Sequence, residues 1–78
     1  MHHIVAKVAI EMGVPGRIMR APTRRQTVFR ARAEAMRRLK EAGYGLRQIG
    51  MYFGGRDHTT VLHAIERAKL RMSLEATE

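Results

Sequence analysis

Apolar residues recur at helical spacing along almost the whole chain. The first set consists of Ile4, Val5, Val8, Ala9 and Met12. It predicts an amphipathic helix over residues 1–12 that ends at Gly13. Val14-Pro15-Gly16 then interrupts regular structure, and a brief helical turn from Pro15 to Met19 is compatible with this break. Because Ala21-Pro22 forms a second break, we expect an exposed basic loop from Pro22 to Gln26.

A longer helix is predicted next, with Thr27 as its N-cap. Its apolar stripe consists of Val28, Ala31, Ala35, Met36 and Leu39. Gly43 follows at the position where a left-handed residue commonly ends a helix. The stripe is therefore expected to form one side of the core.

Two further helices complete the pattern. The first is short, about two turns, and its apolar residues are Leu46, Ile49, Met51, Tyr52 and Phe53. Gly54-Gly55 then favours a sharp reversal, and Asp57 is a good N-cap for the last helix. The apolar stripe of that helix is Val61, Ala64, Ile65, Ala68 and Met72. We expect fraying after Arg71.

No strand pattern competes with these helices, so the sequence predicts an all-α fold, a small helical bundle. The chain has 78 residues and 45% hydrophobic residues, enough for one core and too few for a catalytic domain beside it. We expect a single domain over residues 1–72 and a flexible tail over 73–78. Cysteine is absent, so disulfides cannot supplement the core.

Positive charge is concentrated in one segment. The net charge is +8, and between Arg17 and Lys40 nine bases face a single acid, Glu34. The remaining bases and acids balance at six each. An ordinary solvated surface intersperses the two signs, whereas a concentrated basic patch attracts a polyanion. Nucleic acid is therefore the predicted partner. The alternative, a solvated helix face, explains Arg37 and Arg38 well but explains Arg24 and Arg25 poorly.

A short helix, a glycine turn and a further helix are the components of a helix-turn-helix motif. In that geometry the first turn of the second helix enters the major groove of DNA. Asp57 can accept a hydrogen bond from a cytosine amino group, and His58 can pair with a purine edge. The methyl groups of Thr59 and Thr60 can pack on thymine. A simple N-cap is the alternative for Asp57, and the two roles are compatible.

The eleven residues from Gly54 to Ala64, with the sequence GGRDHTTVLHA, resemble the signature of the C-terminal DNA-binding domain of the bacterial chromosomal replication initiator family, DnaA. Leu46–Gly50 and Phe53 also fit the first helix of that family's helix-turn-helix, and a weaker similarity extends back to Ile4. The resemblance implies a helical domain similar to the Trp-repressor class. It also implies binding of a short duplex element, the DnaA box.

The same resemblance implies contacts for individual residues. It implies base contacts in the major groove for four residues, Asp57, His58, Thr59 and Thr60. Minor-groove contacts fall to Arg24, which aligns with the family's minor-groove arginine, and to its neighbour Arg25. Contacts to the DNA backbone fall to Arg30, Arg32, Lys40, Gln48 and Arg56.

This chain departs from the family pattern in the basic loop. Arg24-Arg25-Gln26-Thr27 replaces a run of alternating basic and serine residues, and Ala31 replaces a proline that is typical of the family. The chain also has no Gly-Lys-Ser/Thr phosphate loop, no nucleophile–base pair and no paired catalytic carboxylates. We therefore expect no enzyme activity and no cofactor.

Two other residue types invite functional interpretations. His58 and His63 are five positions apart on the predicted helix and point in different directions, so no metal site is expected. Met12, Met36 and Met72 fall on core faces and are interpreted as core fillers.

Three functions are compatible with the sequence. The first is sequence-specific binding of double-stranded DNA at a DnaA-box-like element, which would regulate or compete in replication initiation or transcription. The second is an adaptor that binds DnaA or another replication protein through the exposed face of residues 1–12. The third is nonspecific nucleoid binding through charge. The sequence contains neither a membrane-length apolar run nor a secretory signal, so we expect a cytoplasmic, nucleoid-associated protein. We also expect it to bind DNA as a monomer.

Overall fold

The computed structural model describes residues 1–76, and in this range the chain is helical without any strand. The elements are α1 (His2–Glu11), η1 (Gly16–Ile18), α2 (Gln26–Glu41), α3 (Leu46–Tyr52) and α4 (His58–Ala76). The predicted all-α fold is confirmed, and each predicted helix is present in the predicted order. Gly43 has the expected left-handed backbone, with φ of 106°.

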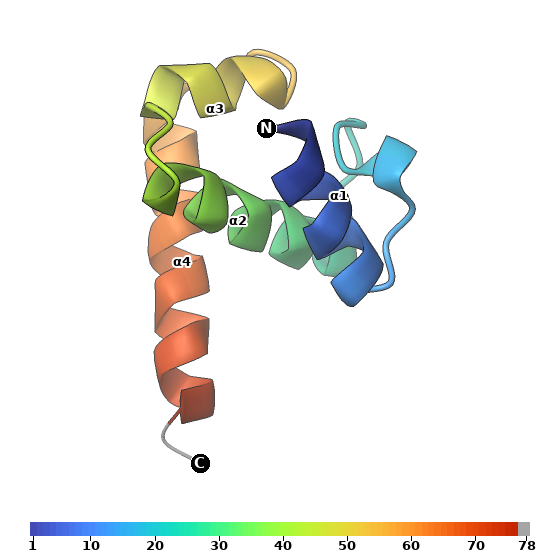
Figure 1. Cartoon of the computed structure of the whole chain (residues 1–78), viewed down its shortest axis with the longest axis vertical. Coiled ribbons are helices and arrows are strands. Elements are labelled where there is room, and N and C mark those ends of the chain that lie inside the picture. Colours follow the sequence, from blue (N-terminus) through green and yellow to red (C-terminus); the bar gives the residue numbers. More distant parts are fainter. Residues whose placement is uncertain (77–78) are drawn as a thin grey trace.

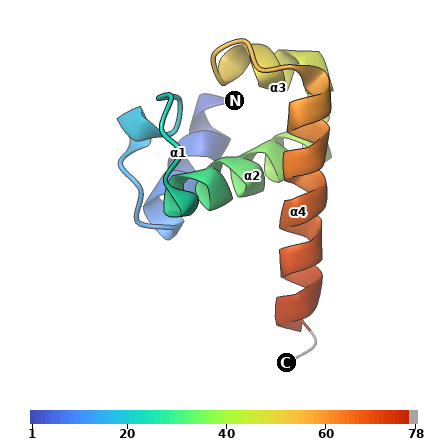
Figure 2. The same ribbon diagram turned by 180° about the vertical axis from the view of Figure 1, so that it is seen from behind.

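Helix α2 is the centre of the molecule. It packs against α1 on one side and against α4 on the other, and α3 lies where α2 ends and α4 begins (Figure 1). Seen from behind, α4 crosses α2, and its C-terminal part extends beyond the other helices (Figure 2). The arrangement leaves the N-terminal end of α4 beside α3, as a helix-turn-helix requires.

The core forms where the predicted apolar stripes meet. Each of the four α-helices contributes a large, fully buried side chain, and the C-cap residues of η1 and α3 contribute two more: Val8, Leu39, Ile49 and Val61, with Met19 and Phe53. Burying each such side chain contributes about 1.5–3 kcal/mol. Met36 is also buried, as predicted. Met19, which the pattern did not single out, follows η1 directly and is completely inaccessible to solvent.

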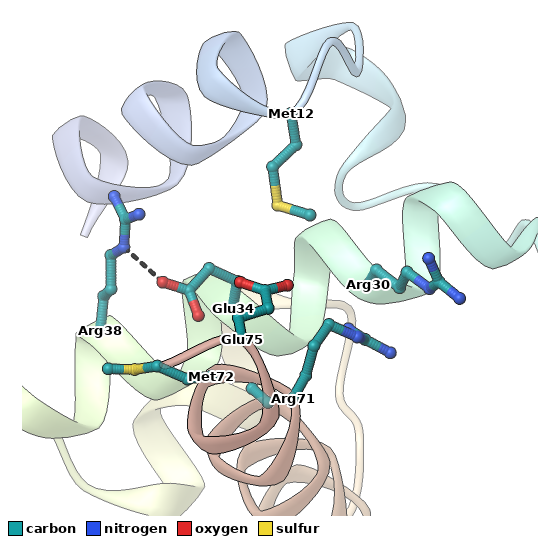
Figure 3. Close-up of a pocket in the computed structure, with 8 residues that line it drawn as sticks. Met12, Arg30, Glu34, Arg38, Arg71, Met72 and Glu75 are labelled. Atoms are coloured by element: carbon teal, nitrogen blue, oxygen red, sulfur yellow. Dashed lines mark hydrogen bonds and ion pairs between the residues drawn. The ribbon is translucent and has the colours of Figure 1, made fainter. Parts of the chain in front are cut away.

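Two of the three methionines interpreted as core fillers are not in the core. Met12 and Met72 remain 39% and 48% exposed. Both line an open hollow between α1, α2 and α4 (Figure 3). Glu34 and Arg38 line the same hollow. Because burial of charged groups in an apolar interior is unfavourable, the hollow stays open to water and the two methionines remain partly exposed.

Two predicted helix boundaries were wrong. Helix α2 begins at Gln26 with Arg25 as its N-cap, so Thr27 lies inside the first turn, and no side chain caps this end. Helix α4 continues to Ala76 instead of fraying after Arg71, since the sequence beyond Arg71 contains no glycine or proline that would stop it. Residues 77–78 of the predicted tail lie outside the described residues, and the division into domain and flexible tail stays a prediction.

No helix within residues 1–76 combines the length and the apolar character needed to cross a membrane.

Candidate nucleic-acid interface

The bend between α3 and α4 depends on three glycines. Gly54 and Gly55 have φ values of 89° and 80°, which only glycine adopts readily. The backbone N–H groups of Gly55 and Arg56 both donate to the carbonyl of Gly50, at 3.0 and 2.9 Å. A Cβ atom on Gly50 would lie 2.2 Å from the carbonyl oxygen of Arg56. The predicted sharp reversal is present, and it requires a glycine inside α3 as well.

The first turn of α4 projects from this bend into solvent. The N–H of Val61 donates to the backbone carbonyl of Asp57 at 3.1 Å, so Asp57 occupies the N-cap position. Val61 is fully buried and anchors the turn. The four predicted base-contacting side chains, at positions 57–60, are all exposed and adjacent.

Asp57 also contacts the neighbouring imidazole. Its Oδ1 atom lies 3.2 Å from Nδ1 of His58, and both side chains are more than half exposed. When Nδ1 carries the proton and donates to this carboxylate, Nε2 is left as the hydrogen-bonding atom that faces outward. The pair therefore orients His58 at the exposed end of the helix.

Arg32 does not lie where the sequence interpretation placed it. It is 5% exposed, and its guanidinium donates to backbone carbonyls of the segment before α2. Nε donates to Met19 at 2.7 Å, Nη1 to Thr23 at 3.1 Å, and Nη2 to Ile18 at 3.4 Å and to Ala21. The expected contact of Arg32 with the DNA backbone is wrong, because its donors are used inside the protein.

Arg32 instead fixes the basic loop from within. Burial and the nearby positive charge of Arg56 lower the pKa of Arg32, yet a guanidinium stays protonated in proteins. Its planar set of donors matches several carbonyls at once, which no other side chain does. A second arginine holds the same segment to α3: Nε of Arg20 donates to the carbonyl of Tyr52 at 2.7 Å. The guanidinium of Arg20 also lies 4.6 Å from the centre of the Tyr52 ring.

Arg20 thus links the segment before α2 to α3, and Arg32 links it to α2. Arg24 and Arg25 remain exposed on the basic loop within this segment. The N–H of Arg25 donates to Oγ1 of Thr23 at 3.4 Å, which adds a local contact. Neither Arg24 nor Arg25 forms an ion pair with any described residue. The sequence predicted the loop and its exposure. It did not indicate that Arg20 and Arg32, from the same basic segment, support it.

Arginines near the end of α2 are neutralised. Arg37 contacts Glu34 at 2.8 Å and Glu41 at 2.6 Å, and Arg38 contacts Glu34 at 2.7 Å and Glu11 of α1 at 2.7 Å. The contact between Arg38 and Glu34 is drawn in Figure 3. Hydrogen bonds from Arg37 lower the pKa of the Glu34 carboxyl, and a hydrogen bond from Arg38 lowers that of Glu11. The charges of these two arginines are therefore already compensated within the protein, which makes both poor contacts for a polyanion.

The other residues predicted to contact the DNA backbone remain accessible. Arg30 and Lys40 are exposed and, within residues 1–76, have no ion pair. Gln48 is exposed and already has one role, since its Oε1 accepts a hydrogen bond from the N–H of Gly45 at 2.8 Å and caps α3. Within residues 1–76 its amide N–H groups form no hydrogen bond, so they can donate to a partner. Arg56 is partly buried beside the bend.

No group of three or more histidine, aspartate or glutamate side chains within the described part of the chain is arranged to hold a metal ion.

A short helix, a glycine bend, a second helix with an exposed first turn and a supported basic loop define a helix-turn-helix domain of the DNA-binding class. The family model described as "Bacterial dnaA protein helix-turn-helix" matches residues 1–68. The chain belongs to this family, which confirms the resemblance seen in the sequence.

Two relatives come from Streptococcus pyogenes, and both are named chromosomal replication initiator protein DnaA. The protein from serotype M49 (strain NZ131) is 44% identical over 62 residues, which cover 78% of this chain and 14% of the relative. The protein from serotype M5 (strain Manfredo) is 39% identical over 74 residues, which cover 94% of this chain and 16% of the relative. The chain thus spans about one sixth or less of the length of these relatives.

Proposed function

We propose that this chain binds double-stranded DNA in a sequence-specific manner at a DnaA-box-like element. One observation supports this proposal above the others. Four short polar side chains stand exposed at the start of α4, and the basic loop exposes two arginines that form no ion pair within the described residues. Short side chains on a helix end can approach base edges in the major groove, which is wide enough to admit a helix.

In the proposed complex, the first turn of α4 reads the major groove. Asp57 accepts from a cytosine amino group while its other oxygen holds His58, and Nε2 of His58 faces a purine edge. Thr59 and Thr60 offer methyl groups to thymine and hydroxyl groups to neighbouring bases. The buried Val61 fixes the depth at which the turn is presented.

The basic loop occupies the neighbouring minor groove. A narrow A·T-rich minor groove has an enhanced negative potential, which favours insertion of Arg24 with Arg25 beside it. Because Arg32 holds the loop from inside, less conformational entropy is lost when Arg24 enters the groove. Arg30, Lys40, Gln48 and Arg56 contact phosphates and set the register of the domain on the duplex.

A fluorescence anisotropy titration tests the proposal. The probes are one duplex that contains a DnaA box and one with the same bases in scrambled order, each at two or more salt concentrations. We expect the box duplex to bind tighter by about 10³-fold or more. Both affinities should fall steeply with salt, by about 0.9 log unit per log unit of salt for each phosphate contacted. Equal affinity for the two duplexes would leave only nonspecific nucleoid binding.

We further propose that this binding acts at replication origins or promoters, where the chain regulates or competes with a full-length initiator. The support is family membership, together with the initiator names of the two streptococcal relatives. Footprinting of an origin fragment with a DnaA protein, in the presence of increasing amounts of this chain, tests the idea. Occupancy of the same boxes with loss of the initiator's own footprint supports competition, whereas independent footprints contradict it.

An adaptor function is the second candidate, and one feature of α1 favours it. Ile10 is 81% exposed on the outer side of α1, where a partner protein could cover it. Truncating α1 is not a clean test, because Val5 and Val8 belong to the core. The substitution Ile10→Asp changes the surface alone. Capture of a DnaA protein that is lost in Ile10→Asp, yet retained in Arg24→Ala with His58→Ala, would support an adaptor.

A further inference from the structure

A further concentration of arginine combines residues that the sequence motif identifies with two that it does not, Arg67 and Arg71 of α4. A hollow opens between the basic loop, the first half of α2 and the middle of α4. The ribbons of these two helices cross in Figure 2. Its lining consists of Thr23, Arg24, Gln26, Phe29, Arg32, Arg56, Arg67 and Arg71. We refer to these eight residues as the arginine pocket. Five of the eight are arginines and none is acidic, so the hollow favours an anion.

The charges of the arginine pocket are not neutralised by the protein. Among the described residues, no carboxylate forms an ion pair with Arg24, Arg56, Arg67 or Arg71. The guanidinium of Arg67 lies 5.8 Å from the centre of the Phe29 ring, a contact that leaves its N–H donors available. In Figure 3 the guanidinium groups of Arg30 and Arg71 lie on one side of the neighbouring hollow, away from the carboxylates of Glu34 and Glu75.

Arg56 provides an independent indication of a ligand. Its Nε atom is buried and has no hydrogen-bond partner within the described residues. Buried donors in proteins are nearly always paired, because removal from water without a replacement acceptor is unfavourable. A phosphate oxygen in the arginine pocket would supply the missing acceptor and would be shared with neighbouring guanidinium groups.

We infer that the arginine pocket binds a phosphate of the DNA backbone through Arg56 and Arg67, with Arg71 at its edge. The choice of DNA as the source of the phosphate rests on the proposed function. Arg67 is seven residues beyond Thr60, so the two side chains share one face of α4 about 10 Å apart along the helix axis. The footprint of α4 on the duplex is therefore longer than its first turn.

A matched pair of variants on α4 tests this inference. Arg67→Gln and Lys69→Gln each remove one positive charge from an exposed position on the same helix. The two side chains point to nearly opposite sides, because successive helical residues are rotated by about 100°. Affinity is measured for the box duplex and the scrambled duplex over a series of salt concentrations.

For Arg67→Gln we expect the slope of log affinity against log salt to fall by about 0.9, and affinity for both duplexes to fall about five- to tenfold near 0.1 M salt. The ratio between the two duplexes should not change, since a phosphate contact carries no base information. Lys69→Gln should leave the slope unchanged. Equal slopes in the two variants would overturn the inference. A wild-type protein that does not discriminate would refute the proposed function only, because the slope difference is measured on either duplex.

A second measurement identifies the source of the phosphate and does not depend on a variant. In ¹⁵N-labelled protein, the Nε–Hε resonance of Arg56 should shift when duplex is added and stay in place with millimolar inorganic phosphate or ATP. Saturation by either small anion at submillimolar concentration, without a response to duplex, would make the arginine pocket a free-anion site. That result would overturn the assignment to DNA.

Discussion

Arg32 shows how the role of one residue depends on where its donors point. Its sequence neighbours Arg30 and Arg25 are exposed and unpaired within the described chain, whereas Arg32 is buried against four carbonyls of residues 18–23. A basic loop carries repelling charges and little regular structure, so it needs such internal support to hold one conformation.

Replacing Arg32 should therefore affect folding before it affects DNA binding. We expect Arg32→Ala to lower the free energy of unfolding by about 2–4 kcal/mol, since several carbonyls lose a charged donor. Arg32→Lys should recover little of this loss, because a single ammonium group cannot replace the planar set of donors. Urea denaturation measures the stability, and faster tryptic cleavage after Arg24 and Arg25 reports the loosened loop. Weaker DNA binding with full stability and an unchanged cleavage rate would contradict this role.

The base-contacting residues should behave differently from the ion-paired arginines. We expect His58→Ala or Thr59→Ala to reduce the preference for the box by about 1–3 kcal/mol, with affinity for the scrambled duplex nearly unchanged. Arg37→Ala should have little effect on either duplex, since Glu34 and Glu41 already occupy its guanidinium. Anisotropy titrations on both duplexes measure these effects. The contact assignment would be wrong if all three variants changed the two affinities in the same proportion.

Among the elements, α3 and α4 are held together by the approach of two backbones rather than by side chains alone. The carbonyl of Gly50 accepts from both residues at the end of the bend, and no space exists there for a side chain. Glycine within a short helix weakens it when it is isolated, so its presence in α3 is explained by this close approach.

Gly50→Ala should accordingly destabilise the domain. The added Cβ meets a backbone carbonyl that cannot rotate away, and we expect a loss of about 2–4 kcal/mol. Gly16→Ala is a suitable control, because a Cβ there meets no atom within 4 Å and the backbone is not left-handed. Thermal unfolding followed by circular dichroism compares the two variants. Equal melting temperatures would show that the bend adapts to a side chain.

Helices α1 and α2 are joined by Arg38, which contacts Glu11 and Glu34 at once. The pKa values of both carboxyl groups are lowered in the folded state. The stabilisation is therefore complete above the unfolded pKa of glutamate, about 4.3, and is lost as pH falls through the lower folded values. The network stabilises the domain at neutral pH and weakens in acid.

Removing Glu34 should make stability less dependent on pH in the acid range. We expect Glu34→Gln to cost less than about 1 kcal/mol at pH 7, because the contacts are partly exposed to solvent. The decrease in unfolding free energy between about pH 5 and pH 2 should be smaller than in the wild type. Glu66→Gln, at an exposed position on α4, is the control. Parallel pH profiles for wild type and Glu34→Gln would contradict the network's contribution.

In the whole molecule, the fold divides the basic segment into parts with different roles. Arg20 and Arg32 hold the loop, Arg37 and Arg38 are paired with acids, and the remaining bases face solvent. Arg67 and Arg71 come from a part of the chain where basic and acidic residues balance, yet they line the same hollow as Arg24. The distribution of charge along the sequence thus locates the basic segment approximately. It does not distinguish the arginines that support the loop or pair with acids from those that face solvent.

Local sequence patterns were sufficient to predict the order of the helices, the glycine bend and the exposed first turn of α4, and to show the family resemblance. Each depends on periodicity, capping or a continuous motif, which act over a few neighbouring residues. The burial of Arg32, the exposure of Met72, the requirement for Gly50 and the arginine pocket came from packing between elements. The contacts of Arg32 span up to 14 residues and those of Arg38 with Glu11 span 27. Such partners meet only when the whole chain folds. The spacing of residues in the sequence therefore does not indicate which arginine donors form hydrogen bonds within the protein and which remain available to DNA.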